Sequence, residues 1–168
     1  MRHRSFSLFL GTAFLTIILF ATTSLNVARA QTTPPDIGTQ LTLAASKVHR
    51  GQVVRASLVL EIPGGYHVNA HNPVSRFALP TKVEVEAPGG MKVGSIIYPK
   101  AIVRRFTFSQ DRLGVYENRA VILIRILVPP NQPKGRSEIK ARLNYQSCSN
   151  EVCFPPTKRE VTASVNVL

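Results

Sequence analysis

The sequence predicts an all-β protein with an immunoglobulin-like antiparallel β-sandwich, and three observations lead to that fold class. Several stretches alternate apolar and polar residues with a period of two, as strands do when one face lies on a core. Clusters of Pro, Gly and Asn separate these stretches at short intervals, as turns do. Beyond residue 30 no segment has a convincing helical repeat of apolar residues.

The predicted strands fall into two groups. In the first group the alternation is regular, so each strand should bury one face and expose the other to water. In the second group it is less regular, and residues 120–128 are almost continuously apolar, as expected of a central strand. The first group comprises residues 52–62, 81–86, 137–146 and 160–167, and the second comprises residues 41–45, 91–98 and 116–128.

Seven or eight short strands in about 130 residues predict an immunoglobulin-like sandwich. One feature of the antibody type is absent from the sequence. That type joins its two sheets by a core disulfide packed on a tryptophan, whereas this chain has no tryptophan and only two cysteines, five positions apart. The cysteines are therefore not expected to link the sheets.

The first thirty residues have the pattern of a signal peptide. Arg2 and Arg4 form a positive N-terminal region, an apolar run follows over residues 6–21, and Ala28-Arg29-Ala30 supplies a cleavage site. We expect cleavage after Ala30, which leaves residues 31–168 as one exported, periplasmic domain. The alternative is an uncleaved membrane anchor, since the apolar run is long for a signal peptide.

The remaining domain is basic. Loss of the first thirty residues leaves 18 of the 21 Lys and Arg residues against all 9 Asp and Glu residues, so the net charge falls from +12 to +9. The basic residues are scattered, with no dense run and no aromatic signature of RNA binding. The sequence therefore argues against nucleic acid as a partner.

Cys148 and Cys153 are the strongest candidates for chemistry. The residues between them include Ser149-Asn150-Glu151, a turn-like run that would bring the two Cα atoms within the range of about 4.4–6.8 Å usual for a disulfide. Continuing the alternation of the preceding strand places Cys148 on the polar face beside Gln146. We therefore expect at least one sulfur near solvent.

Spacing alone leaves two interpretations of this pair. An exported protein with two cysteines usually forms a structural disulfide. However, closing so short a loop removes only about 2 kcal/mol of denatured-state entropy, against nearly 5 kcal/mol for a loop of about a hundred residues. Two thiols at an exposed turn also suit thiol–disulfide exchange, in which one attacks and the other resolves.

Three segments resemble one known family. The run Tyr-Gln-Ser-Cys-Ser-Asn-Glu-Val-Cys-Phe-Pro-Pro, residues 145–156, is similar to the active-site segment of the N-terminal periplasmic domain of the thiol:disulfide interchange protein DsbD. Residues 63–73 resemble the family's glycine–aromatic–histidine–hydrophobic–asparagine segment, and residues 113–117 resemble its Leu-x-Val-Tyr-Glu segment. The three segments occur in the order of the family and span most of residues 41–168.

The resemblance implies an immunoglobulin-like domain that shuttles electrons in the periplasm, as part of a protein-disulfide reductase system without a cofactor. Its Cys148/Cys153 pair would accept reducing equivalents from a thioredoxin-like protein served by a membrane electron transporter, and would reduce client disulfides. By analogy Cys153 forms the mixed disulfides and Cys148 resolves them. The family's full-length protein also has membrane and thioredoxin-like domains, so we expect the donor here to be a separate protein.

The resemblance also implies a loop with an aromatic cap over the cysteines. Its counterpart lies in residues 104–110, where Phe106 or Phe108 would shield the sulfurs until a partner displaces the loop. The alternative is that one or both rings fill the core, since Phe-x-Phe also fits a strand.

Two other functions remain open. An exported sandwich with an inert disulfide would be a binding module. Alternatively, His67 and His71 could join the cysteines in holding Cu(I), which soft thiolates select, although the two histidines do not share a helix face as in metalloproteases. We expect no resident metal.

Overall fold

The computed structural model describes residues 33–168, so the predicted signal peptide lies outside the described residues. These residues form twelve β-strands and no helix. Among them there is consequently no helix that could cross a membrane. The strands are β1 (Gly38–Leu43), β2 (Lys47–Val48), β3 (Val53–Glu61), β4 (His67–Asn69), β5 (Lys82–Glu86), β6 (Lys92–Ile97), β7 (Ile102–Arg105), β8 (Arg112–Tyr116), β9 (Arg119–Leu127), β10 (Gly135–Tyr145), β11 (Ser147–Cys148) and β12 (Thr157–Val167).

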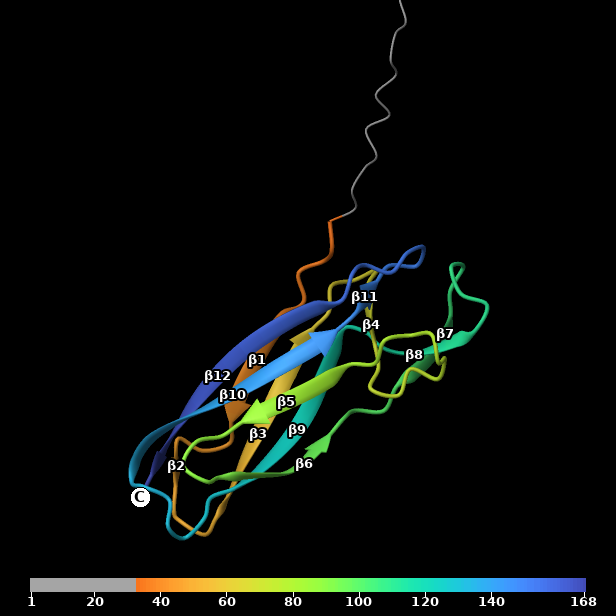
Figure 1. The fold of residues 1–168 in the computed structure, drawn as a ribbon. Helices are drawn as coiled ribbons and strands as arrows, with labels where there is room; N and C mark the ends of the chain where they lie inside the picture. The colour runs from red at the N-terminus through yellow and green to blue at the C-terminus, as the bar shows by residue number, and fades with distance from the viewer. Residues whose placement is uncertain (1–32) are drawn as a thin grey trace, which may run out of the picture. The chain divides into compact units, whose positions relative to one another are not determined.

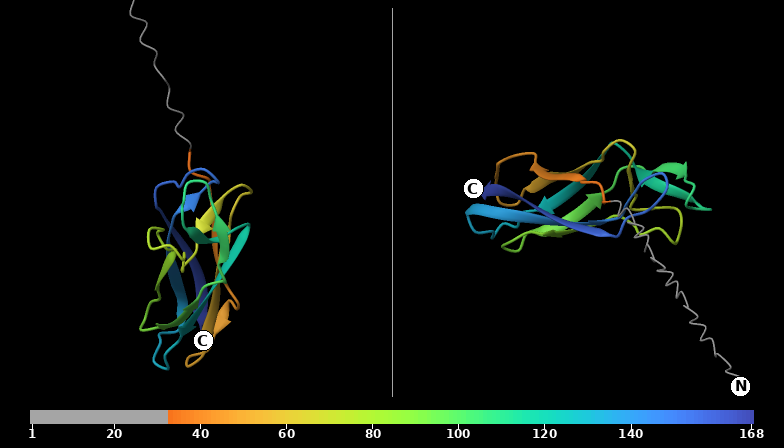
Figure 2. Two further views of the ribbon diagram at one scale, coloured as in Figure 1. Left: turned by 90° about the vertical axis from the view of Figure 1, so that its right-hand side faces the viewer. Right: turned by 90° about the horizontal axis from the view of Figure 1, so that it is seen from above.

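Two four-stranded sheets form the body of the molecule. One has the order β1-β3-β9-β6 with antiparallel neighbours throughout. The other has the order β2-β12-β10-β5, in which only the short β2 runs parallel to its neighbour. Figures 1 and 2 show the two sheets as face-to-face layers, which is the arrangement of an immunoglobulin-like sandwich.

The core between the sheets comes from the alternation seen in the sequence. In β10, Ile139, Ala141 and Leu143 are fully buried, while the residues between them are more exposed. In β3 and β9, Leu58 and Ile122 are register partners and both are fully buried. Each fully buried large aliphatic side chain contributes roughly 1.5–3 kcal/mol to folding, so this layer supplies most of the hydrophobic stabilisation.

The predicted strand over residues 116–128 is wrong as a single unit. Tyr116 ends β8, and a turn at Asn118 with φ of 58° leads into β9. The carbonyl of Asn118 accepts a hydrogen bond from the Ile62 N–H at 2.6 Å, which fixes this corner. Consequently β8 and β9 belong to different sheets.

The position of β9 in the centre of its sheet is confirmed, because it lies between β3 and β6. Its continuous apolar run does not reflect burial on both faces, however. Leu123 and Leu127 point outward and are exposed, while Ile122, Ile124 and Ile126 are buried.

A third small sheet, with the order β11-β4-β8-β7, was not predicted from the sequence. All its strand pairs are antiparallel. It lies at one end of the sandwich, where β10 passes into β11 (Figure 1). This sheet carries the cysteines and the segments that surround them.

Candidate redox site

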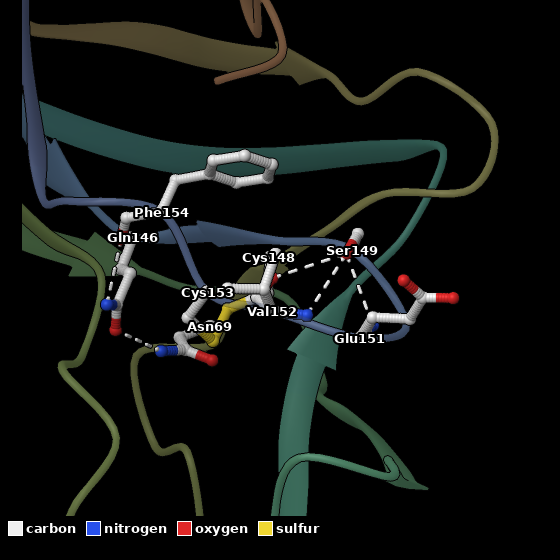
Figure 3. The surroundings of a disulfide bond; sticks show 8 residues. All are labelled: Asn69, Gln146, Cys148, Ser149, Glu151, Val152, Cys153 and Phe154. Carbon is white, nitrogen blue, oxygen red and sulfur yellow. Dashed lines mark hydrogen bonds between the residues drawn. A yellow bond between two sulfur atoms is a disulfide. The ribbon is translucent and has the colours of Figure 1, made fainter. Parts of the chain in front are cut away.

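Cys148 and Cys153 form a disulfide across a tight hairpin (Figure 3). The two cysteines are also partners in an antiparallel bridge, and their Cα atoms lie 3.9 Å apart, slightly closer than predicted. Ser149 closes the turn: its N–H donates to the Val152 carbonyl at 2.8 Å, and its Oγ accepts from the Glu151 and Val152 N–H groups. The predicted turn is confirmed.

The predicted orientation of Cys148 is wrong. Cys148 is 0 % exposed, whereas Cys153 is partly exposed. The alternation of β10 does not continue through Gln146 because β10 ends at Tyr145, and residues 147–148 pair instead with β4 of the third sheet. The change of sheet turns the Cys148 side chain into the molecule.

Gln146 and Asn69 hold the hairpin against β4 (Figure 3). The Gln146 Nε2 donates to the Phe154 carbonyl at 3.0 Å, and its Oε1 accepts from the Asn69 Nδ2 at 3.1 Å. The Asn69 N–H also donates to the Gln146 carbonyl at 3.1 Å. These bonds fix Phe154, which follows Cys153, and Gln146, which precedes β11, so they hold the chain on both sides of the cysteine pair.

His67 lies beside Cys148. The two residues are register partners in the β4–β11 pair, so their side chains share a face of the third sheet. His67 is 2 % exposed, and its Nε2 has no hydrogen-bond partner among the described residues. Burial lowers the pKa of His67 from 6.5 to about 4, although the Glu117 carboxylate acts in the opposite direction. The ring is therefore neutral at pH 7.

The β7–β8 loop covers this part of the site. Phe106 stacks on His67 with ring centroids 4.0 Å apart, and Phe108 lies 5.4 Å from Phe106. The Thr107 Oγ1 donates to the Asn150 carbonyl in the cysteine hairpin at 3.0 Å. Neither phenylalanine belongs to the buried core cluster, so they do not fill the core of the sandwich. The loop thus contacts both the hairpin and the histidine beside it.

An ion pair connects the base of that loop to the end of β8. The Arg104 Nε lies 3.0 Å from the Glu117 Oε1. The hydrogen bond from Arg104 lowers the pKa of the Glu117 carboxyl. Glu117 is therefore charged at neutral pH and lies within electrostatic range of His67.

A hollow of about 420 Å³ opens beside Cys153. Phe108 and residues 109–111 line one side, and Phe77 and Ala78 from the β4–β5 loop line another. Asn69 and Gln146 lie in its wall. Cys148 is not part of this wall, so the hollow gives access to only one of the two cysteines.

Of the two candidate histidines, only His67 lies next to a cysteine, and His71 makes its contacts elsewhere. His71 stacks on Tyr98 with centroids 3.8 Å apart, and its Nδ1 lies 2.9 Å from the Thr81 carbonyl. Across residues 33–168 no group of three or more His, Cys, Asp or Glu side chains is placed to hold a metal ion. The geometry offers no support for copper handling.

Comparison with known families agrees with this site. The family model described as thiol:disulfide interchange protein DsbD, N-terminal, matches residues 39–164. That match covers most of the chain, including both cysteines and the loop that carries Phe106. The chain belongs to this family.

Solved structures resemble this DsbD N-terminal domain in fold. One is the complex of the DsbD and PilB N-terminal domains from Neisseria meningitidis, with 18 % identity, 79 % of this chain and 87 % of that chain covered, and a TM-score of 0.50. The reduced DsbD N-terminal domain of the same organism has 19 % identity, 76 % and 85 % coverage, and a TM-score of 0.48.

A third similar structure is the N-terminal periplasmic domain of ScsB from Proteus mirabilis. It has 14 % identity, 73 % of this chain and 43 % of that chain covered, and a TM-score of 0.49. No curated protein gives a significant match. At these identities the structural likeness concerns the fold, and the family membership is carried by the match to the family model.

Sequence reasoning did not identify several residues of this DsbD N-terminal domain that shape the site. Asn69 and Gln146 were present in the segments that resembled the family, but their mutual hydrogen bond depends on the pairing of β4 with β11. Phe77 and Ala78 gave no signal, because an apolar residue in a loop has no periodicity to mark it.

Proposed function

We propose that this protein is a periplasmic thiol–disulfide exchange module that carries reducing equivalents on the Cys148/Cys153 pair. One observation carries the proposal. The two cysteines of the family's motif form a disulfide at a hairpin in which only Cys153 borders an open hollow. A partner's sulfur can reach one member of the pair, while the other lies directly behind it.

The exchange proceeds in two steps when the pair starts as dithiol. The Cys153 thiolate attacks one sulfur of a client disulfide, the client S–S bond breaks, and the other client sulfur leaves as a thiolate that takes up a proton. The Cys148 thiolate then attacks the Cys153 sulfur and expels the client's second sulfur. Two electrons and two protons pass to the client, and the Cys148–Cys153 disulfide forms.

The burial of the two residues supports this order of attack. Cys148 is fully buried, and its approach from solvent is closed by the hairpin and by His67, its cross-strand neighbour. Cys153 is partly exposed and borders the hollow. Since exchange requires in-line access to a sulfur, Cys153 forms the mixed disulfide and Cys148 resolves it.

Phe106 and Phe108 act as the cap in this proposal. Phe106 stacks on the ring beside Cys148, and Phe108 lines the hollow that leads to Cys153. Within residues 33–168, one exposed side-chain hydrogen bond, from Thr107 to Asn150, joins the cap loop to the hairpin. Such a bond contributes only about 0.5–1.5 kcal/mol, so a docking partner can displace the loop.

The partners we propose are a thioredoxin-like donor, reduced in turn by a membrane electron transporter, and client proteins with disulfides. The structure of a complex between a DsbD N-terminal domain and a PilB N-terminal domain, both from Neisseria meningitidis, has been solved, so a domain of this fold can form a complex with a separate protein. Electron flow from the donor to the clients is the direction we propose.

The periplasmic location rests on the signal sequence. Cleavage after Ala30 would release a protein that begins at Gln31. The intact mass of the protein purified from the cell envelope tests this. Retention of the first thirty residues would instead indicate a membrane-anchored module.

The exchange function is tested with single-cysteine variants and oxidised glutathione. Reduced wild-type protein should lose both thiols and end as the Cys148–Cys153 disulfide. The Cys148→Ser variant should stop at a stable mixed disulfide, detected as a mass increase of one glutathione. The Cys153→Ser variant is the matched control and should react at least about tenfold more slowly, because its thiol is buried.

One result would contradict the exchange function, and another would contradict the order of attack. One is a native disulfide that a mild dithiol cannot reduce without denaturant, which marks an inert structural link in a binding module. The other is equal reactivity of the two single-cysteine variants, which would remove the assignment of attacking and resolving sulfurs.

A further inference from the structure

The loop between β4 and β5 presents apolar side chains to solvent beside the cysteine hollow. Phe77 is 78 % exposed and Val74 is 68 % exposed. Leu79 in the same loop is also exposed. Large apolar residues that gather on one surface loop indicate an interaction site more strongly than single scattered ones.

Hydrogen bonds hold this loop against the β7–β8 hairpin. The Ser75 Oγ donates to the Asp111 Oδ2 at 2.6 Å and accepts from the Phe77 N–H at 3.3 Å. The Gly114 N–H donates to the Pro73 carbonyl at 2.7 Å. A Cβ at Gly114 would lie 2.7 Å from the Asn72 carbonyl oxygen, so the close approach of the two segments requires glycine there. Phe77 is therefore exposed on an anchored loop and not on a free one.

Phe77 lies between two hollows. The first hollow is the one that borders Cys153. A second hollow, also of about 420 Å³, is lined by Val74, Arg76 and Arg112. Ser75, Phe77 and Asp111 line both of them. A chain that reaches Cys153 through the first hollow thus passes the Phe77 ring and comes next to the two arginines.

The arginines around the second hollow lack acidic partners. Among the described residues no carboxylate forms an ion pair with Arg76, Arg112 or Arg105. Arg105 and Arg112 are register partners across the β7–β8 hairpin, and like charges placed opposite each other destabilise a strand pair. The Arg76 guanidinium lies 4.8 Å from the centroid of the Phe77 ring. Arg76 and Arg112 thus lie beside the Phe77 side chain, and Arg105 lies next to Arg112 on the neighbouring strand.

The acidic groups nearby do not neutralise this cluster. The Asp111 carboxylate, which accepts the hydrogen bond from Ser75, lines the second hollow and offsets one of the two positive charges of Arg76 and Arg112 there. The Glu117 carboxylate is paired with Arg104. The Glu151 side chain is exposed at the tip of the cysteine hairpin (Figure 3). The second hollow therefore presents a net positive charge and apolar surface together, and it shares Ser75, Phe77 and Asp111 with the hollow that borders Cys153.

We propose that the surface formed by Phe77, Arg76, Arg105 and Arg112 docks an acidic partner protein, in which the reacting cysteine is flanked by carboxylate side chains and an apolar residue. The inference rests on the proposed exchange function and adds the kind of partner that the site selects. The apolar residue contacts Phe77, the carboxylates reach the arginines, and the partner's sulfur lies at Cys153. Charge complementarity of this kind raises the rate of encounter and rejects basic partners.

The probes are three synthetic peptides that differ only in charge. Each has one cysteine followed by leucine, flanked by glutamates, by glutamines or by lysines, and its cysteine is carried as a mixed disulfide with thionitrobenzoate. The Cys153 thiolate of the reduced protein attacks the peptide sulfur and releases the coloured thionitrobenzoate thiolate. Each rate constant is divided by that of the same peptide with mercaptoethanol, which carries no charge besides its attacking thiolate and corrects for the intrinsic reactivity of the peptide.

We expect the corrected rate constant to be about tenfold higher for the glutamate peptide than for the lysine peptide at low salt, with the glutamine peptide between them. The preference should shrink as salt shortens the Debye length to about 10 Å at 0.1 M. The Arg76→Gln, Arg112→Gln double variant should lose most of it. Phe77→Ser should slow the reaction of all three leucine peptides about threefold or more. In a second set of peptides, with glycine in place of the leucine, the same variant should change the rate constants little.

The matched control is the double variant Arg50→Gln, Lys134→Gln. It removes the same charge from the β2–β3 and β9–β10 loops, which lie at the other end of the sandwich (Figure 1). It should keep the glutamate preference, and thermal unfolding should show that all variants are folded.

The outcomes separate the two proposals. Equal corrected rates for the three peptides would overturn the acidic docking surface while leaving exchange at Cys153 intact. The docking surface would also be overturned if the Arg50→Gln, Lys134→Gln control lost as much of the glutamate preference as the Arg76→Gln, Arg112→Gln variant. That result would show that only the net charge of the protein matters. Failure of the reduced protein to release thionitrobenzoate from any peptide would overturn the exchange function and the docking with it.

Discussion

The body of the sandwich and its cysteine-bearing end bury their side chains in different ways. Between the two large sheets the fully buried large side chains are mostly aliphatic, as at Leu58, Ile122 and Ile139. Most of the buried polar residues among the described residues lie in or beside the small third sheet, at His67, Asn69, Ser75, Thr81 and Ser147. Three of the four buried side-chain atoms without a hydrogen-bond partner among the described residues lie there, in His67, Asn69 and Ser147.

This difference has an energetic meaning. A buried polar group without a partner lowers the stability of the fold by about 1–3 kcal/mol. The small sheet is therefore destabilising in this respect, and the aliphatic core of the body offsets the loss. Buried polar groups without partners depart from the usual rules of packing, and such departures are expected at sites where a protein binds or reacts. The contrast teaches that the large sheets supply most of the hydrophobic stabilisation, while the small sheet carries the candidate redox site. Changes in the two regions should therefore affect different measurable properties.

The largest effect should come from truncating the core of the body. Leu58→Ala should lower the free energy of unfolding by about 3–5 kcal/mol, because it removes apolar burial and leaves a cavity. The measurement is urea denaturation. Below the transition, the reactivity of the cysteine pair should match that of the wild type. Altered reactivity in the folded variant would show that the two regions are coupled.

The second effect concerns pH and His67. Its pKa in the folded protein is about 4, below 6.5, so the unfolded state binds more protons between these values and stability falls as the pH falls through this window. From about pH 7 to pH 4.5 the protein should lose about 2 kcal/mol through this residue. A His67→Phe variant should not show this loss of stability. The measurement is the free energy of unfolding, from urea denaturation at several pH values.

The control for that prediction is His49→Gln, at an exposed site in the β2–β3 turn. It should keep the pH dependence of the wild type. If His67→Phe and the wild type lose stability equally over this range, His67 is not the source of the pH dependence.

A smaller effect is expected from the cap. Phe106→Ala removes the stacking on His67, which is worth about 0.5–1.5 kcal/mol. It should also raise the rate at which Cys153 of the Cys148→Ser variant reacts with iodoacetamide, because the loop no longer covers the site. Alkylation at an unchanged rate would contradict the shielding role of Phe106.

The smallest effect should come from an exposed ion pair on the body. Arg119 and Glu61 form such a pair at 2.9 Å, with both side chains largely exposed. Arg119→Gln should change the free energy of unfolding by no more than about 1 kcal/mol and leave cysteine reactivity unaltered. A larger loss in a thermal melt would mean that exposed ion pairs contribute more to the stability of the body than this account predicts.

The strands of the body could be predicted because one side of each faces water. Their alternation is visible in the sequence, and β3, β5 and β10 appear within a residue or two of the predicted bounds. The strands of the third sheet do not alternate. All three residues of β4 are buried and all four of β7 are exposed. Neither strand therefore shows the alternation of apolar and polar residues by which a strand is recognised in a sequence.

The candidate site was predicted in part for a related reason. The cysteine pair and its turn were evident from local residues, and the resemblance led to Phe106 and Phe108. The burial of Cys148 was not predictable, because it follows from a change of sheet after Tyr145. The exposure of Phe77 depends on Ser75 and Asp111, which are far apart in the sequence and meet only in the fold.

The reduction potential of the Cys148/Cys153 pair tests the central claim most directly. The protein is equilibrated in graded glutathione buffers, and the fraction of disulfide is read from the mass added by alkylation. A potential of about −200 to −270 mV, in the range of known exchange proteins, is what the account predicts. A potential well below about −300 mV would mark a structural disulfide and contradict the account.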